Sequence, residues 1–174
     1  MAFTLNTGER AQRKTLITVA EWGTGNTPDR EILGTRTEDS SIELNADIET
    51  STDIRGITYT DVNKTEPQQD FDPYYLLGGS KLGEYLLQAM LENDIAKYNN
   101  VFTIYIITAI IDSGSGQTHA YKTIKHTGCS IIPTAVGGDS YVNMPIEVHY
   151  SNNIAVGTVD KLSDDFTFTE VTNL

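Results

Sequence analysis

One segment of the chain repeats its apolar side chains at the spacing of an α-helix. Between residues 80 and 98 they form two adjacent rows: Leu82, Leu86 and Met90 in the first, and Leu87, Leu91, Ile95 and Tyr98 in the second. Rows spaced in this way predict an amphipathic helix, and the hydroxyl of Ser80 can cap its first turn. We expect the apolar stripe to pack on the rest of the domain; the alternative is a contact with another subunit.

Most of the remaining chain favours β-strands. Runs of β-branched residues and alternating patterns predict strands at 15–22, 31–35, 41–44, 53–62, 101–111, 118–132, 141–150, 154–159 and 166–171. We expect 31–35 and 41–44 to pair as a hairpin that turns through 36–39. Many strands with one helix, and no alternation of strand and helix, predict a mainly β fold. Its expected form is an antiparallel β-sandwich or barrel with one flanking α-helix at about residues 80–98.

The length of 174 residues favours a single domain, 1–174, because a chain of this size buries a core without disulfides or metals. The polar stretch 1–14 is expected to form an N-terminal arm. The stretch 63–79, which contains Pro67 and Pro73, is expected to be an extended connection before the helix.

Acidic residues outnumber basic ones by 24 to 12, which gives a net charge of −12. A protein that grips nucleic acid needs Lys and Arg to neutralise phosphates, so this class of function is not favoured. Between residues 38 and 72, ten acidic side chains are accompanied by only two basic ones, Arg55 and Lys64. We therefore expect this region to present a strongly negative surface.

The first residues and the cysteine content indicate the cellular compartment. Residues 1–4 do not begin a basic-then-apolar signal sequence, and no apolar run approaches the roughly 18 residues of a membrane span. Cys129 is the one cysteine, which excludes an internal disulfide framework and a cysteine-based zinc site. We expect a soluble protein, made in the cytoplasm, with no membrane partner.

No pattern indicates a reaction centre. The stretch 23–25 (GTG) lacks the Lys-Ser/Thr of a phosphate-binding loop, and nothing resembles Gly-x-Ser-x-Gly. His119, His126 and His149 are far apart, and strand alternation would place His126 and Cys129 on opposite faces. We therefore expect no catalytic residue, no metal site and no cofactor, and a structural or binding protein rather than an enzyme.

Four stretches of the sequence resemble the major tail (tail tube) proteins of bacteriophages. They are 31–45 (EILGTRTEDSSIELN), 53–69 (DIRGITYTDVNKTEPQQ), 137–150 (GGDSYVNMPIEVHY) and 157–162 (GTVDKL). The resemblance runs over most of residues 31–168 and depends on the order of elements, not on a catalytic signature. Related tubes occur in contractile tails, tailocins and type VI secretion.

The resemblance implies a structural virion protein with a tail-tube-like fold. Hexameric rings of this chain would stack into a hollow tube, which would conduct DNA into the host. Its partners would be further copies of itself and a tape-measure protein, with sheath, baseplate and tail terminator proteins as further candidates. Double-stranded DNA would pass through the lumen without specific binding, because a negative lining repels phosphates. The protein would be located in the virion tail and assembled in the host bacterial cytoplasm.

Within that setting, two groups of residues are candidates for defined surfaces. Contacts between rings would involve charged residues of the arm and of the acidic region: Arg10, Arg13, Lys14, Glu38, Asp39, Asp70 and Asp72. The lumen would be lined by polar strand positions: Asn143, Glu147, His149 and Lys122.

A different function class remains open at this point. A monomeric β-sandwich could instead serve as a carbohydrate-binding or adhesion module, which would need an exposed aromatic platform. Trp22 is the one tryptophan, and Tyr74 and Tyr75 are the one adjacent aromatic pair.

Overall fold

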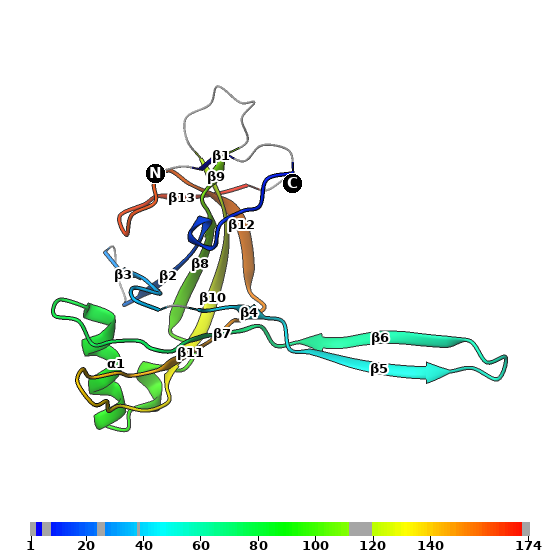
Figure 1. The fold of residues 1–174 in the computed structure, drawn as a ribbon, viewed down its shortest axis with the longest axis horizontal. Helices are drawn as coiled ribbons and strands as arrows, with labels where there is room; N and C mark the ends of the chain where they lie inside the picture. The colour runs from blue at the N-terminus through cyan, green and yellow to red at the C-terminus, as the bar shows by residue number, and fades with distance from the viewer. Residues whose placement is uncertain (1–2, 5–7, 24–26, 38, 112–119, 172–174) are drawn as a thin grey trace.

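In the computed structural model, residues 3–4, 8–23, 27–37, 39–111 and 120–171 are described. Two antiparallel sheets share one strand, a single helix packs on one side, and a long hairpin projects on the other (Figure 1). The expected mainly β, antiparallel class with one flanking helix is therefore confirmed.

The first sheet runs through the centre of the molecule. Its strands, in spatial order, are β3 (Asp29–Ile32), β2 (Leu16–Trp22), β8 (Phe102–Thr108), the first half of β10 (Tyr121–Pro133), β12 (Ile154–Val159) and β13 (Phe168–Glu170). All of these neighbours are antiparallel. A separate parallel pair joins β1 (Phe3–Thr4) to β9 (Ile110–Ile111).

The second sheet begins on the same strand. The last four residues of β10 pair with β11 (Ile146–His149), which pairs with β7 (Gln68–Phe71), and β7 pairs with β4 (Ile42–Glu43). Between Thr127 and Cys129 the pairing of β10 with β8 shifts by one residue, and Gly128 there has φ +82°. A bulge of this kind bends a strand, and this one separates the part of β10 in the first sheet from the part in the second.

The helix is shorter than the sequence predicts. Helix α1 (Lys81–Leu91) begins as expected, with the Ser80 hydroxyl accepting a 3.0 Å hydrogen bond from the Gly83 amide. It ends at Leu91 because Asn93 turns left-handed at φ +53°. The amides of Asn93 and Asp94 then bond the carbonyls of Met90 and Ala89 at 3.2 and 2.9 Å, which is a Schellman motif. A short 3-10 turn, η2 (Ile95–Lys97), follows, so the helix predicted at 80–98 is corrected to 81–91.

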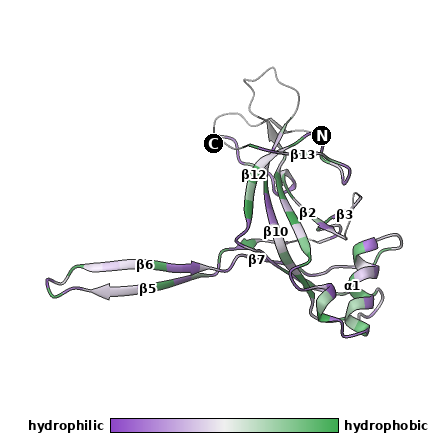
Figure 2. Ribbon diagram, turned by 180° about the vertical axis from the view of Figure 1, so that it is seen from behind, coloured by the Kyte–Doolittle hydropathy of each residue, from purple (hydrophilic) through white to green (hydrophobic). Residues whose placement is uncertain are grey.

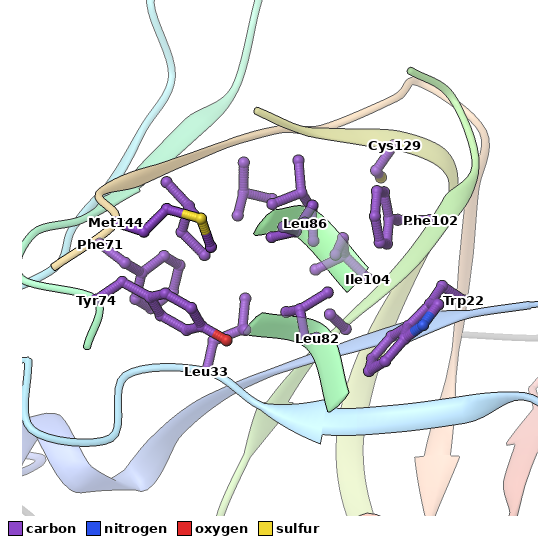
Figure 3. Close-up of a cluster of buried hydrophobic side chains, with 14 of the residues drawn as sticks. Trp22, Leu33, Phe71, Tyr74, Leu82, Leu86, Phe102, Ile104, Cys129 and Met144 are labelled. Atoms are coloured by element: carbon purple, nitrogen blue, oxygen red, sulfur yellow. The ribbon is translucent and has the colours of Figure 1, made fainter. Parts of the chain in front are cut away.

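The main hydrophobic core lies between the two sheets and α1 (Figure 3). It combines side chains from β2, β7, β8, β10, β11 and the helix, and its members with an exposed fraction of 1% or less include Phe71, Leu82, Leu86, Phe102, Ile104, Ile131, Met144 and Val148. A smaller cluster on the opposite face of the first sheet packs Tyr105 and Tyr121 against Phe166. The helix therefore covers only one face of the first sheet.

A buried amide joins the two sheets. The Oε1 atom of Gln69 on β7 accepts hydrogen bonds from the Thr18 hydroxyl (3.1 Å) on β2 and the Tyr150 hydroxyl (2.5 Å). Its Nε2 donates to the Ser40 hydroxyl at 3.0 Å, and the Ser40 carbonyl accepts two bonds from the Arg13 guanidinium. Burial raises the pKa of Tyr150 well above its ordinary value of 10, so this hydroxyl stays a donor. The network connects the start of the first sheet to the second sheet.

Three sequence expectations are wrong. The stretches 31–35 and 41–44 do not pair with each other, since β3 pairs with β2 and β4 pairs with β7. The segment 46–52 is a strand that the pattern did not suggest. His126 and Cys129 share one face, because the bulge at Gly128 places them opposite Ile104 and Phe102.

The stretch 63–79, expected as an extended connection, contains the end of β6 (Thr58–Thr65) and all of β7. Seven of its seventeen residues, 63–65 and 68–71, therefore belong to paired strands before the helix begins. In the arm 1–14, Arg13 and Lys14 belong to a short 3-10 turn, η1 (Arg13–Thr15).

We predict that Gln69→Leu destabilises the fold. The substitution leaves the Thr18 and Tyr150 hydroxyls without an acceptor in a buried site, at a cost of about 1–3 kcal/mol for each unmade bond. We expect the free energy of unfolding, measured by urea denaturation of the monomer, to fall by about 2–4 kcal/mol. Gln68→Leu, at the more exposed neighbouring position, is the control. Equal effects of both substitutions would contradict the role given to Gln69.

Candidate assembly surfaces

The most prominent surface is the hairpin formed by β5 (Ala46–Thr52) and β6. Both strands stand clear of the sheets and the helix, and the hairpin extends away from the side that carries α1 (Figures 1 and 2). Every residue of β5, and every residue of β6 except Thr65, is exposed. An isolated two-stranded hairpin is marginally stable in water, and this one has its own cross-strand pairing and turn but gains little from packing on the described part of its chain.

The register of the hairpin sorts its residues into two faces. Residues directly opposite each other point to the same side. One side, which we name the uncharged face, holds only threonine and aliphatic side chains: Ile48, Thr50, Thr52, Thr58, Thr60 and Val62. The other, the charged face, holds Asp47, Glu49, Ser51, Tyr59, Asp61 and Lys64.

The two faces differ in what they can contact. On the charged face Glu49 lies directly opposite Asp61, and like charges in this position repel. On the uncharged face Ile48 and Val62 form a cross-strand pair, each more than half exposed. The uncharged face is therefore suited to packing against protein, and the charged face to water.

The tip of the hairpin is organised by one carboxylate. Oδ1 of Asp53 accepts from the amides of Arg55 (2.8 Å) and Ile57 (3.0 Å), and Oδ2 pairs with Nε of Arg55 at 3.3 Å. The Gly56 amide bonds the Asp53 carbonyl, with Gly56 at φ +79°. The Ile57 amide, followed by the Arg55 amide and side chain, lowers the pKa of Asp53 below its ordinary value of 3.8.

Three of the acidic residues expected at ring contacts lie together. Asp39, Asp70 and Asp72 are exposed and line one shallow depression with Glu43 and Gln68. Glu38, the fourth, lies outside the described residues. We name this surface the acidic depression.

The basic residues expected in the same contacts are placed differently. The Arg13 guanidinium donates to the main-chain carbonyls of Ser40 (2.9 and 3.1 Å) and Leu16 (2.6 Å), so it fastens the arm to its own chain. Lys14 lines a cavity beside the acidic depression. Arg10 is exposed. Whether these residues contact another ring stays a prediction.

The residues expected to line the lumen do not form one surface. Glu147 and His149 on β11 are 3.4 Å apart and point away from the core, and Glu147 lies opposite Asp70. Lys122 belongs to the opposite face of β10, in register with Thr108 and Thr158. The pair Glu147 and His149 and the single residue Lys122 therefore remain separate candidates for the lumen.

Asn143, the fourth lumen candidate, has a structural position. Its side chain accepts from the Tyr74 amide at 2.8 Å and donates to Asp72 at 3.2 Å. It thereby holds the segment before the helix beside the loop that precedes β11.

The helical stripe is split between core and surface. Leu82 and Leu86 are fully buried, whereas Leu91 and Ile95 have exposed fractions of 73% and 58%. The first part of the stripe is core, as expected, and its end is an exposed apolar surface.

Two of the three residues considered for an aromatic platform are buried, whereas Tyr75 is half-buried and its ring lies 6.3 Å from that of the exposed Tyr141. Trp22 and Tyr74 each have an exposed fraction of 5% and belong to the main core. The Tyr74 hydroxyl donates to Glu31, whose carboxylate also accepts from the Ser80 hydroxyl and the Leu82 amide at the start of α1. Both aromatic rings therefore serve the fold.

The described residues present neither a cluster of metal ligands nor an activated cysteine. Among the described residues, no group of three His, Cys, Asp or Glu side chains could hold a metal ion. Burial raises the pKa of the Cys129 thiol, which disfavours the reactive thiolate. Within the described ranges, no helix is both long and apolar enough to span a bilayer.

The hairpin and its tip are the features that sequence reasoning missed or misplaced. The strand 46–52 contains one large apolar residue, Ile48, so it lacks the alternation of a half-buried strand. A turn signal was present: Asp53 and Gly56 stand three positions apart, the preferred residues for the first and last positions of a type I turn. It could have placed the turn at 53–57 and the missing strand before it.

Comparisons with known proteins give structural likenesses only. No protein-family model matches the chain, and no curated protein matches it. A chain of the extended PVC sheath–tube complex, an extracellular contractile injection system, is similar at 12% identity, with a TM-score of 0.48 over 88% of this chain and 95% of that one. A chain of the extended PVC sheath/tube terminator matches at 12% identity and a TM-score of 0.47, over 87% and 99% of the two chains.

A chain of the tube-terminating cap of the anti-feeding prophage is also similar, at 13% identity and a TM-score of 0.46, over 88% of this chain and 95% of that one. At these identities and TM-scores, the likeness does not identify a function. The function is therefore inferred from the surfaces of this chain.

We predict that the order of the tip depends on the ionised Asp53 carboxylate. Its pKa is lower in the folded tip than in the unfolded chain, so its contribution is present above pH 3.8 and is lost as the pH falls through the lowered value. We expect Asp53→Ala to remove the exchange protection of the Gly56 amide at neutral pH, as measured by NMR. Asp53→Asn, which keeps an acceptor oxygen, should retain part of it. An unchanged exchange rate in Asp53→Ala would contradict this account.

Proposed function

We propose that this chain is a structural subunit that assembles with copies of itself into hexameric rings stacked as a hollow tube for DNA delivery. The observation that carries the proposal is the projecting hairpin, whose uncharged face is exposed along its length. A two-stranded hairpin of this kind gains stability when a third surface covers it.

A second copy of the chain is the partner that this shape favours. The hairpin lies on one side of the molecule and α1 on the other, so the donating and receiving surfaces differ (Figure 1). A contact between two different surfaces is heterologous, and repetition of it closes into a ring or continues as a filament. If the copies close into rings and the rings stack through the same hairpins, the assembly is closed around its axis and continues along it.

The edges of the first sheet offer a second contact. Strands β3 and β13 end the series and have a partner on one side only among the described strands. Pairing of these edges between neighbouring copies would remove unpaired edges and join six sheets around a lumen. The net charge of −12 on each copy would then help DNA to slide rather than adhere.

The remaining partners follow from the tube. A tape-measure protein would occupy the lumen during assembly, and sheath, baseplate and terminator proteins would contact the outside and the ends. The similar solved chains come from assemblies of the same class. The site of action would be the tail of a virion or a similar particle.

We predict that a charge on the uncharged face prevents assembly. Thr50→Asp places a carboxylate where a second copy would pack, whereas Ser51→Asp adds the same charge to the charged face. Burial of an unpaired carboxylate costs several kcal/mol, so we expect Thr50→Asp to remain monomeric and Ser51→Asp to assemble. Sedimentation velocity and negative-stain electron microscopy over a concentration series measure both.

Six-fold rings or hollow tubes of the wild-type chain would support the proposal. A wild type that stays monomeric at every concentration, together with binding of a glycan by that monomer, would favour the binding-module alternative. Assembly that proceeds equally in Thr50→Asp and Ser51→Asp would exclude the hairpin from the contact.

A further inference from the structure

The tip of the hairpin has the properties of a preformed anchor. Ile54 has an exposed fraction of 106%, so nothing in the described chain covers this side chain. The hydrogen bonds of Asp53 fix the turn that carries it. An apolar side chain on an ordered turn loses little conformational freedom when it binds, which favours affinity.

A cavity with apolar residues in its lining opens beside β2. Strand β3 pairs with β2 only from Val19 onward, so the edge at residues 16–18 has no strand beside it. Leu33, Gly34, Thr37 and Ser40 border the gap, which forms a cavity of about 320 Å³. Its lining combines apolar residues with polar ones: Leu16, Ile17, Ile32, Leu33 and Phe71 with Arg13, Lys14, Thr18, Thr37 and Ser40.

The size of the cavity suits a branched aliphatic side chain. An apolar cavity of about 150 Å³ can hold a benzene molecule, and this one is about 320 Å³. The volume is therefore sufficient for the isoleucine side chain at the tip.

Charges of both signs lie at the cavity: Arg13 and Lys14 belong to its lining, and the acidic depression adjoins it. The acidic depression is complementary to the arginine at the tip. The cavity and the acidic depression share Ser40, so Asp39 and Asp70 lie next to the cavity mouth. Arg55 follows Ile54 in the chain, and its side chain is 70% exposed. In the described chain only its Nε has a hydrogen-bond partner, Asp53. The other guanidinium nitrogens are free to bind carboxylates.

The tip cannot enter the cavity of its own chain. Strand β5 has seven residues and β6 has eight, and a rise of about 3.3 Å per residue places the tip roughly 20–25 Å from the hairpin base. Ser40, at the cavity, lies close to that base, just before β4. The occupant must therefore come from a second copy.

We propose that Ile54 of one copy inserts into the cavity beside β2 of a second copy, while Arg55 binds the acidic depression next to it. The inference rests on the proposed self-assembly and names the contact that joins the copies. The tip and the cavity are different surfaces of each copy, so the contact is heterologous.

The first test concerns the anchor. We expect Ile54→Ser to leave the fold intact because this side chain is fully exposed in the described part of the chain. The control, Leu91→Ser, removes another highly exposed apolar side chain far from the tip. We expect Ile54→Ser to raise the concentration needed for assembly by about tenfold to a hundredfold. Leu91→Ser should remain within about threefold of the wild type. An equal shift in both variants would overturn the inference.

The second test exchanges the charges. Arg55→Glu and Asp39→Lys should each weaken assembly, and the double variant should restore it, because the pair is inverted. Lys64→Glu, at the base of the hairpin, changes the net charge as much as Arg55→Glu and should have the smaller effect. Failure of the double variant to recover would assign the two residues to separate contacts and overturn the inference.

The outcomes separate this inference from the proposed function. Tubes that form from Ile54→Ser and Arg55→Glu at the wild-type concentration would leave the proposed function standing and remove the tip from the contact. A wild type that never associates would overturn both.

Discussion

The architecture depends on the bend in β10 at Gly128. Because the strand shifts register between Thr127 and Cys129, its first half lies in one sheet and its second half in another. The angle between the sheets makes the space that the main core fills, with Phe102 and Ile104 from one side and Ile131 and Val148 from the other. The helix closes that space with Leu82 and Leu86. Without the bend, the two inner faces would continue as one flat surface, and the core would have no depth.

The buried amide of Gln69 stabilises this arrangement where the second sheet lies beside Arg13 and the start of β2. It bonds a hydroxyl from each sheet and, through Ser40, reaches the loop that Arg13 also binds. That loop forms a wall of both the cavity and the acidic depression. The polar network that supports the core therefore also fixes the geometry of the surface proposed to receive a second copy.

The sequence predicts the core elements well and the assembly elements poorly, for one physical reason. The first turns of α1 bury one face within their own chain, so their apolar periodicity is visible. Strand β2 is buried on both faces, with Ala20 and Trp22 in the main core and Val19 in the smaller cluster, so it reads as a run of apolar and β-branched residues. Strand β5 buries nothing within its chain, and its run of threonine and acidic residues reads as a loop. The end of the helix was misplaced because Leu91 and Ile95 continue the apolar rows past the turn at Asn93, although both are exposed. Strand β5 was missed because it lacks an apolar pattern, and the helix end was misplaced because its apolar pattern has no partner within the described chain.

The acidic residues that make the hairpin resemble a loop in the sequence can also control when the proposed contact between copies forms. Each copy carries a net charge of −12, and the charged face places Glu49 opposite Asp61, so free copies repel one another over roughly the Debye length of 8–10 Å at physiological salt. The uncharged face and Ile54 act only at contact. Long-range repulsion with short-range apolar attraction keeps dilute copies apart and makes association steeply dependent on concentration and ionic strength. A chain built in this way can expose a long hairpin before assembly without aggregating through it.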